Sequence, residues 1–393
     1  MTLIKPLLIF VKSLLFFLFD SLALSNVRSS NSNQLKLILL IRLDAIGDFV
    51  MWLDTAKEYQ KLYPSDKYKI LLAGNKIWCD LADELPYWDK VIPVDLKQFT
   101  TFSNYRWNLL KEIRSLKVQI AIQPTFSREF YNGDALVRAS GARRKVSSRG
   151  DMSNRNRLKK ILADCWHTEL ISASVEPLTE LERNSEFFSG LTDSVHLTRY
   201  PKLDIPKFWL TPERNKKTFY ILVPGSSGAV AGKEWPPKFF SELAKKVFQK
   251  TGWEGLICGA EQEHKLGEKI RKQCDAPLQN YCGQTTLVEL ASLLSQSRLT
   301  ISNDTGTVFL SSAVGTTSIC ILGGGHFGRF VPYPDLPGQA NNLHTVYHKM
   351  PCYGCNWVCI FPFTKGEPTP CIANISVEIV WNKVRPLLTN KTL

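Results

Sequence analysis

Apolar and polar positions along the chain follow one repeated scheme, in which short apolar runs alternate with longer amphipathic segments. After residue 34 the first half has the apolar runs LKLILLIRL, KYKILLAG, KVIPVD and VQIAIQP, with helical patterns such as DFVMWLDTAKEYQKLY and RWNLLKEIRSL between them. The second half has TFYILVPG, WEGLICG, RLTISND and TSICILG, separated by PPKFFSELAKKVFQK, QEHKLGEKIRKQC and TLVELASLLSQ. Strands that alternate with helices predict parallel sheets covered on both faces. We therefore expect an α/β protein with two doubly wound sheets.

A proline-rich, charged stretch separates the two halves. It reads YPKLDIPKFWLTPERNKK and spans residues 200–217. A chain of 393 residues also exceeds the roughly 250–300 residues at which a single core stops growing. We predict an N-terminal domain over residues 34–210 and a C-terminal domain over residues 211–393. Ligands of open parallel sheets bind at the carboxyl ends of the strands, so we expect the ligand there, between the domains.

Residues 1–33 are expected to form an amphipathic helix followed by a polar linker. The first 26 residues are strongly apolar, but charges leave no uninterrupted run near the roughly 20 residues that span a bilayer. On a helix, four polar residues would form one narrow stripe opposite a wide apolar face: Lys5, Lys12, Ser13 and Asp20. This pattern favours a helix that lies on a membrane surface through residues 1–26. A signal peptide and a helix docked on the protein's own core are the alternatives.

The charge balance makes anionic partners plausible. Lys and Arg number 49 against 36 Asp and Glu, a surplus of 13. Phosphorylated substrates, acidic lipids and nucleic acid all fit this surplus, but nucleic-acid binding would rest on it alone, and we expect none. The densest basic stretch runs from Arg143 to Lys160. It is either a solvated face or an anionic acceptor site, for which the candidates are Arg143, Arg144 and Lys145.

The cysteines indicate a reducing compartment, and hence a cytoplasmic protein. Ten cysteines in a chain of this size are too sparse for a disulfide scaffold. Four of them fall in PCYGCNWVCIFPFTKGEPTPC with the spacing C-x2-C-x3-C-x11-C: Cys352, Cys355, Cys359 and Cys371. This is not a standard zinc finger or ribbon. Metal binding, a disulfide and packed free thiols all stay open for these four.

The first candidate for chemistry is IRLDAIGDFVMWL, where a small-residue turn joins a strand to a helix. It carries two carboxylates, Asp44 and Asp48. Asp48 can begin the helix, and the same position can present its carboxylate as a base at the end of the sheet. Asp44 is expected to be structural or to face an acceptor.

Two segments of the second half have the features of anion sites. In VPGSSGAVAGKEWPP, small residues including Ser226 and Ser227 let backbone amides approach an anion, and Lys233 adds a point charge. In ISNDTG, Asp304 is a good N-cap, and the amides that follow it, at Thr305 and Gly306, form a phosphate-sized site.

Two further positions at strand ends belong to the same pattern. The strand TSICIL ends in Gly323 and two more glycines, which permit close approach of a ligand to the backbone. The strand before GAEQEH is followed by Glu261 and Glu263, which are either partners of the helix dipole or acceptors for ribose hydroxyls.

These motifs together resemble glycosyltransferase family 9, the ADP-heptose:lipopolysaccharide heptosyltransferases. The resemblance runs over about residues 36 to 385 as an ordered series of RLDAIGDFVMWL, PGSSGAVAGKEWPPKFFSELA, GAEQEH, CGQTTLVELASLLSQSRLTISNDTG and the cysteine-containing tail. It implies the GT-B fold, two Rossmann-like domains with an interdomain cleft. The C-terminal domain would hold a nucleotide sugar, and the N-terminal one an anionic glycolipid or oligosaccharide acceptor. The reaction would invert the anomeric centre without a metal or another cofactor, on the cytoplasmic side of the inner membrane.

The resemblance also implies roles for individual residues. Asp48 would be the general base, and Lys233 would neutralise the diphosphate leaving group. The remaining matched positions would hold the nucleotide sugar: Gly47, Ser226, Ser227, Glu263, Asp304, Thr305, Gly306 and Gly323.

Two places in the sequence depart from the family pattern. Relatives usually carry histidine where this chain has Phe309, and the turn reads DAIGD instead of a TSSMGD-like string. The departure leaves the transferred sugar open between a heptose and a hexose. It also leaves two alternatives, a non-catalytic nucleotide-sugar-binding component of a polysaccharide assembly system and another GT-B enzyme such as a nucleotide-sugar epimerase.

Overall fold

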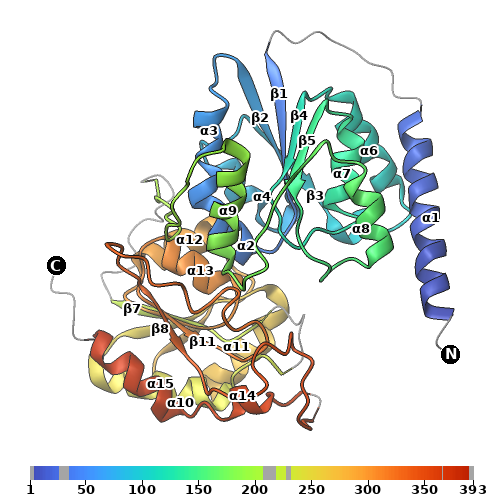
Figure 1. The fold of residues 1–393 in the computed structure, drawn as a ribbon. Coiled ribbons are helices and arrows are strands. Elements are labelled where there is room, and N and C mark those ends of the chain that lie inside the picture. The colour runs from blue at the N-terminus through green and yellow to red at the C-terminus, as the bar shows by residue number, and fades with distance from the viewer. Residues whose placement is uncertain (1–3, 26–34, 207–217, 227–231, 365, 389–393) are drawn as a thin grey trace. The chain divides into compact units, whose positions relative to one another are not determined.

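The structure, a computed structural model, describes residues 4–25, 35–206, 218–226, 232–364 and 366–388. The chain divides into two compact units (Figure 1). Unit 1 comprises Met1–Ala45, Thr55–Glu176 and Glu182–Thr198, and unit 2 comprises Ile46–Asp54, Pro177–Leu181 and Arg199–Leu393. The expected domain boundary at residues 210 and 211 lies outside the described residues, so the predicted domain limits stay predictions.

Unit 1 contains a six-stranded parallel sheet of order β3-β2-β1-β4-β5-β6. Its strands are β1 (Lys36–Arg42), β2 (Tyr68–Asn75), β3 (Lys90–Val94), β4 (Ile120–Gln123), β5 (Arg144–Ser148) and β6 (Glu169–Ile171). This is the strand order of doubly wound nucleotide-binding sheets. The central strand β1 is buried on both faces, with Ile38 and Ile41 fully inaccessible, as its unbroken apolar run predicts.

Helices cover the sheet of unit 1. They are α3 (Tyr59–Leu62), α4 (Lys76–Asp83), α5 (Leu96–Phe99), α6 (Asn104–Ser115), α7 (Gly133–Ser140), α8 (Arg157–Asp164) and most of α9 (Glu180–Thr192). The pattern DFVMWLDTAKEYQKLY, predicted as one helix, forms α2 (Ile46–Ala56) and then α3. Most of α2 is grouped with unit 2.

Unit 2 repeats the architecture with the order β12-β11-β10-β7-β8-β9, again all parallel. Its strands are β7 (Phe219–Val223), β8 (Glu254–Ile257), β9 (Leu278–Asn280), β10 (Thr300–Asn303), β11 (Ser318–Ile321) and β12 (Leu343–Val346). Its helices are α10 (Pro237–Thr251), η2 (Glu261–Glu263), α11 (His264–Lys272), α12 (Leu287–Gln296), α13 (Gly306–Ala313), α14 (Pro370–Ala373), α15 (Val377–Val384) and η3 (Arg385–Leu388). The two doubly wound sheets of the sequence prediction are confirmed.

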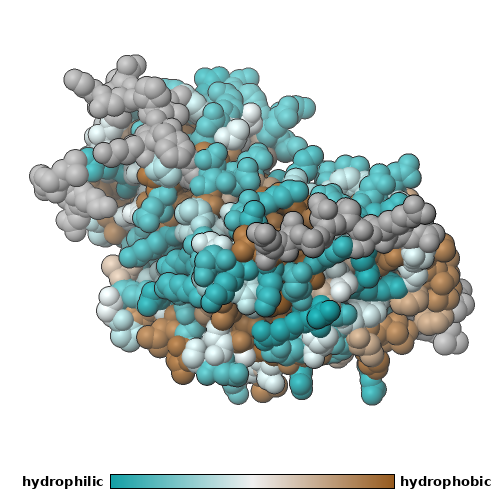
Figure 2. Space-filling view, turned by 90° about the horizontal axis from the view of Figure 1, so that it is seen from above, coloured by the Kyte–Doolittle hydropathy of each residue, from teal (hydrophilic) through white to brown (hydrophobic). Residues whose placement is uncertain are grey.

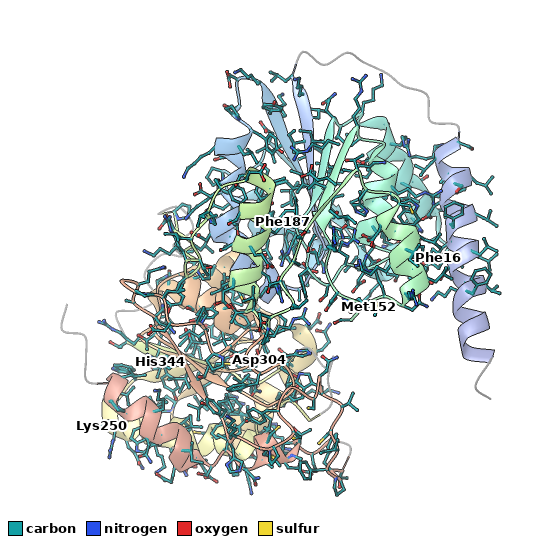
Figure 3. All side chains as sticks on the ribbon, viewed as in Figure 1. Phe16, Met152, Phe187, Lys250, Asp304 and His344 are labelled. Carbon is teal, nitrogen blue, oxygen red and sulfur yellow. The ribbon has the colours of Figure 1, made fainter. Side chains whose placement is uncertain are left out.

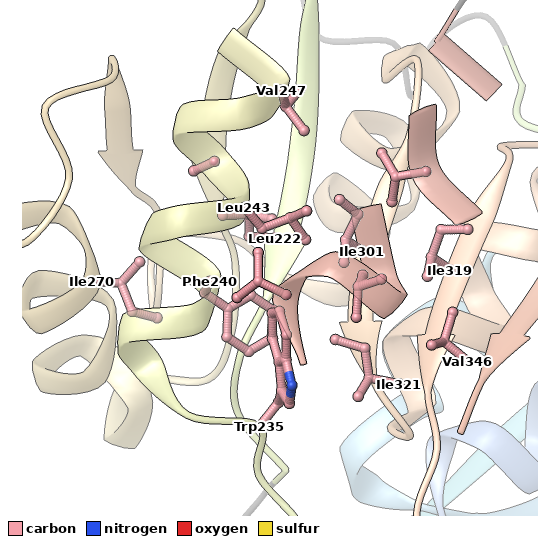
Figure 4. Close-up of a cluster of buried hydrophobic side chains, with 14 of the residues drawn as sticks. Leu222, Trp235, Phe240, Leu243, Val247, Ile270, Ile301, Ile319, Ile321 and Val346 are labelled. Atoms are coloured by element: carbon pink, nitrogen blue, oxygen red, sulfur yellow. The ribbon is translucent and has the colours of Figure 1, made fainter. Parts of the chain in front are cut away.

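The core of unit 2 fixes the loop that enters α10. Trp235 is buried among Leu222, Phe240 and Ile321 (Figure 4). Its indole Nε1 donates to the carbonyl of Ile375 at 2.7 Å. A buried indole whose N–H is satisfied holds a single orientation. The backbone two residues before it, at Lys233, is therefore held close to a rigid core.

The N-terminal helix α1 (Ile4–Ser25) packs on unit 1 through the polar stripe of the sequence analysis. Asp20 accepts two hydrogen bonds from the buried guanidinium of Arg106, at 2.7 and 2.6 Å. The Ser13 hydroxyl is 2.9 Å from that of Tyr131, and Phe16 is 1% exposed between α1 and the rest of the unit (Figure 3). For the described side chains, α1 is thus docked on the protein itself, as one of the alternatives expected. The side chain of Lys5 lies outside the described residues.

The outward side of α1 is apolar. Seven large hydrophobic residues are at least one-third exposed: Phe10, Val11, Leu14, Leu15, Phe17, Leu18 and Leu22. Figure 2 shows hydrophobic residues gathered at the edge of the molecule where α1 lies. Among the described residues, no helix is long and apolar enough to cross a membrane.

Candidate active site

The site is built at the topological switch point of the second sheet. There β7 and β10 are neighbours, but their chain connections run to opposite sides, so the loops after them diverge. Such a switch point is where doubly wound sheets bind ligands. The loop after β7 leads to Lys233, and the one after β10 contains Asp304, which lies just past the strand end (Figure 3).

Asn303 ties these two loops together. Its side-chain Nδ2 donates to the carbonyl of Pro224 at 2.6 Å, and its Oδ1 accepts from the backbone N–H of Trp235 at 3.1 Å. Asn303 itself is fully buried. Because one side chain bonds to both ends of the 224–235 loop, it fixes the position of that loop against the end of β10.

The result is a mostly buried ion pair between two predicted site residues. Lys233 Nζ lies 3.2 Å from Asp304 Oδ2, and the side chains are 17% and 5% exposed. The expected N-cap role of Asp304 is wrong. The N-cap of α13 is Thr305, and Asp304 lies one residue before it. The first amides of a helix have no partner within it, so the start of α13 offers donors beside the ammonium group of Lys233.

The start of α2 packs against the start of α13 through two glycines. A Cβ on Gly306 would lie 2.7 Å from the Cβ of Ile46, and a Cβ on Gly47 would lie 2.9 Å from the ring of Phe309. Real Cβ atoms essentially never approach so closely, so a side chain at either glycine would force its neighbour to shift. Asp48 is half-buried in the first turn of α2. Within unit 2, the structure thus brings the start of α2 to the start of α13.

Glu263 lies over the ends of β7 and β8. A Cβ on Gly225 would lie 1.8 Å from Glu263 Oε1, and one on Gly259 would lie 2.4 Å from Oε2. Oε2 also accepts from the backbone N–H of Ala260 at 2.8 Å. The carboxylate of Glu263 is therefore held at the carboxyl edge of the sheet.

Of the two predicted serines, Ser226 is buried and donates to Glu234 at 3.1 Å. Ser227 lies outside the described residues.

Gly323 is covered by an aromatic residue that sequence reasoning missed. A Cβ on Gly323 would lie 2.6 Å from the ring of Trp357, and one on Gly325 would lie 2.3 Å from it. The Lys233 ammonium lies 5.6 Å from the centroid of the same ring. The glycines therefore admit Trp357, which also borders Lys233. Trp357 lies in an irregular tail without periodicity, so no pattern marked it.

A histidine was also missed. His326 follows the three glycines, and its Nε2 donates to Asn356 Oδ1 at 2.7 Å. Burial lowers the pKa of His326, and the charges of Asp304 and Lys233 act on it in opposite directions. A histidine directly after a glycine run at a strand end was the available signal.

Asp44 has a structural environment in unit 1. Its carboxylate pairs with Arg42 Nε at 2.6 Å and accepts from the hydroxyl of Thr125 at 3.0 Å. Its carbonyl accepts from the indole of Trp78 at 2.9 Å. These bonds fix the turn that leads from β1 into α2.

The structure does not bring Arg143, Arg144 and Lys145 to the edge of the sheet that carries Asp44. They lie at the amino end of β5, and Arg144 pairs with Glu169 at 2.9 Å. Other charges of the same basic stretch are also neutralised internally, since Arg155 is buried and pairs with Asp134 at 3.2 Å. This placement gives no support to acceptor binding by the three residues.

Two doubly wound sheets, with Lys233 and the start of α13 at the switch point of the second, match the GT-B fold of glycosyltransferases. The family model for glycosyltransferase family 9 (heptosyltransferase) matches residues 157–355. The chain belongs to this family.

Named relatives and solved structures agree. The chain is 22% identical over 331 residues to lipopolysaccharide heptosyltransferase 2 of Escherichia coli K12, covering 80% of this chain and 90% of that one. A glycosyltransferase family 9 structure from Veillonella parvula aligns over 91% of this chain and 99% of its own, with a TM-score of 0.67 and 16% identity. The E. coli heptosyltransferase WaaC with ADP-2-deoxy-2-fluoro heptose aligns over 89% and 99%, with a TM-score of 0.63 and 16% identity.

Proposed function

We propose that the protein transfers a sugar, with inversion and without a catalytic metal, from a nucleotide donor to a lipopolysaccharide-type or lipid-linked glycan. The observation that supports this proposal most directly is the Lys233–Asp304 ion pair at the start of α13. We propose ADP-heptose as the donor, because a named relative is a lipopolysaccharide heptosyltransferase and a solved neighbour holds a fluorinated ADP-heptose.

The chemistry of the leaving group supports this choice of site. When the sugar leaves a nucleoside diphosphate, negative charge develops on the diphosphate. The ammonium of Lys233 and the first amides of α13 are oriented donors at a desolvated position, where such stabilisation is most effective. A cation is already supplied by the protein there, so a metal is not needed for this step.

Asp48 is the proposed base. It would take the proton of the acceptor hydroxyl as that oxygen attacks the anomeric carbon. A carboxylate with a reference pKa near 4 is a weak base, so its contribution depends on its position. The packing of Gly47 on Phe309 holds the turn that carries Asp48. Glu263 is proposed to accept hydrogen bonds from the ribose.

We further propose that the protein acts in the cytoplasm at the surface of the inner membrane. The apolar outer side of α1 is continued by α8, where Leu158, Ile161 and Leu162 are exposed. The two helices are neighbours, because Lys12 and Lys159 both lie over the ring of Tyr131. Exposed apolar residues flanked by lysines fit an anionic lipid surface. A glycolipid acceptor would be held in that surface.

A donor screen by mass spectrometry with purified protein and a truncated glycolipid acceptor tests the reaction. We expect one sugar mass added to the acceptor, with release of the nucleoside diphosphate, and no product with Asp48→Asn. Donor converted without acceptor would indicate an epimerase. A donor that is bound but never consumed would indicate a non-catalytic component.

A further inference from the structure

The four tail cysteines converge on one cavity of unit 2. Cys352, Cys355, Cys359 and Cys371 line it together with Trp357 and Gly324, although they are spread over the segment from residue 352 to residue 371. The first three are partly exposed and Cys371 is buried. The other cysteines of the chain do not line this cavity. Four thiols on one cavity are more than random placement in a loop explains.

The backbone holds this arrangement against the glycine loop of the active site. The N–H of Gly354 donates to Gly324 at 2.8 Å, and that of Asn356 donates to Gly325 at 2.9 Å. The N–H of Gly324 in turn points to Cys371 Sγ at 3.5 Å. The cysteine loop and the end of β11 therefore form one substructure.

Only part of the cysteine loop packs on the core, where Met350 and Tyr353 contact the hydrophobic cluster of unit 2. Between β12 and α14 the described residues include no helix or strand. Val358 and Ile360 are both 73% exposed, so they contribute little to a core. Asn356 and Trp357 have positive φ values of 51° and 63°, which non-glycine residues rarely adopt. An irregular segment that carries four cysteines can be held by a metal bound to their sulfurs.

We propose that Cys352, Cys355, Cys359 and Cys371 bind a single transition-metal cation, zinc or iron, in a closed tetrahedral site. Four sulfur ligands in tetrahedral geometry are typical of these two metals. In the described residues no three His, Cys, Asp or Glu side chains are already arranged as metal ligands. Binding therefore requires the thiols to rotate and the loop to contract until each sulfur lies about 2.3 Å from the metal.

The metal has a structural role that reaches the active site. Trp357 lies between Cys355 and Cys359 in sequence and covers Gly323 and Gly325. The tail is also tied to the residue before Lys233, since the N–H of Thr369 donates to the Gly232 carbonyl at 2.9 Å. The cation would hold Trp357 and the Lys233 loop in place without touching the substrate. This proposal does not rest on the transfer reaction.

Metal analysis of the purified full chain is the primary test. We expect about one equivalent of zinc or iron in the wild type and less than about a tenth of that in Cys352→Ser and Cys355→Ser. Cys165→Ser is the matched control, because Cys165 is an exposed cysteine away from the cavity, and it should keep the metal. Elemental analysis distinguishes zinc from iron. No bound metal in the wild type, or unchanged metal in both cavity variants, overturns the proposal.

Two further measurements keep the proposal testable if the variants fail to fold. Cobalt added to metal-free wild type should give the intense sulfur-to-metal absorption of tetrahedral thiolate coordination, and should slow proteolysis between residues 352 and 371. Thiol titration of the denatured, unreduced protein should find all ten cysteines. A deficit of two or more thiols that reductant restores would mean disulfides, and an absent cobalt band would mean unliganded thiols; either result overturns the site.

Discussion

The ammonium of Lys233 lies 3.2 Å from the carboxylate of Asp304 in a position where both side chains are largely withdrawn from water. Burying such a pair costs desolvation free energy that its mutual attraction does not always recover. Its location at the start of α13 agrees with the proposed function, in which Asp304 would orient Lys233 until an anion binds. The same pair links the two loops that Asn303 already ties together. In the proposed reaction, the cation that stabilises the leaving group would therefore be in place before the donor binds.

Replacing Lys233 by alanine should lower both the affinity for the nucleoside diphosphate and the rate of transfer. Loss of one oriented donor to developing charge lowers kcat by about 100- to 1,000-fold. Calorimetric titration with ADP and steady-state kinetics measure the two effects. Lys238→Ala, an exposed lysine on α10, is the control and should behave as wild type. Unchanged binding and rate in Lys233→Ala would remove its proposed role.

Asp48→Asn and Asp44→Asn should separate chemistry from structure. Asp48→Asn should lower kcat by at least about 100-fold while ADP affinity and melting temperature stay near wild type, because only the base is lost. Asp44→Asn should instead lower the free energy of unfolding by about 1–3 kcal/mol, since the buried Arg42 loses a charged partner. Kinetics and denaturant unfolding report the two quantities. Near wild-type turnover in Asp48→Asn would contradict the assignment.

Gly47→Ala should disturb the active turn through Phe309. The added methyl would lie 2.9 Å from the Phe309 ring, and overpacking of this kind typically costs about 1–3 kcal/mol of unfolding free energy. A double-mutant cycle with Phe309→Val, which removes the ring atoms, measures the coupling. We expect the double variant to be more stable than the two single effects predict. Strict additivity would show that the two residues do not compete for space.

The fold was predictable where apolar patterns are strong. Strands β1 and β7 have continuous apolar runs because both faces are covered, and both were predicted. The strands β5, β6, β9 and β12 were missed, since they are short and carry polar residues such as Arg144 or His344. Their strand conformation depends on pairing with neighbours, which no local pattern reveals.

The site was predictable in part for a related reason. Asp304 directly follows β10, whereas Gly47 and Lys233 lie near the starts of the helices after β1 and β7, where local residue types suggested a site. Trp357 and His326 reach the same place through the irregular tail and the loop after β11, so only the tertiary structure brings them together. The polar stripe of α1 was located correctly. Its contact with Arg106 could not be predicted from a local pattern, because Asp20 and Arg106 are 86 positions apart in the chain.

Acid should destabilise the protein in part through His167. Burial lowers the pKa of His167 from 6.5 to about 3, and its neutral ring bonds to Arg128 Nη1 at 3.0 Å. Between these values the unfolded chain binds a proton that the folded protein does not, so the unfolding free energy falls by up to about 1.4 kcal/mol per pH unit as pH drops from 6.5 toward 3. His167→Gln should flatten this slope relative to the exposed His348→Gln. Identical slopes in urea unfolding between pH 4 and 6 would refute the contribution.

The outward face of α1 should govern membrane binding separately from folding. Deleting residues 1–26 is a poor test, because it removes Asp20 from the buried Arg106 and uncovers the site of Phe16. Replacing Leu15, Leu18 and Leu22 by glutamine leaves that inner face intact. These residues are 49%, 49% and 63% exposed, so the melting temperature should stay near wild type.

Cosedimentation with vesicles containing anionic lipid should then fall at least about tenfold for this triple variant, since both apolar burial and the docking geometry of the flanking lysines are lost. Ile77→Gln removes a hydrophobic side chain that is 56% exposed elsewhere in unit 1 and serves as the control. Neutral vesicles should bind the wild type more weakly, because Lys12 and Lys159 would then lack an opposite charge.

Light scattering without lipid tests whether a second copy of the chain covers this face of α1. A wild-type dimer that the triple variant abolishes, with vesicle binding unchanged, would show that a second copy of the chain covers it instead of a membrane.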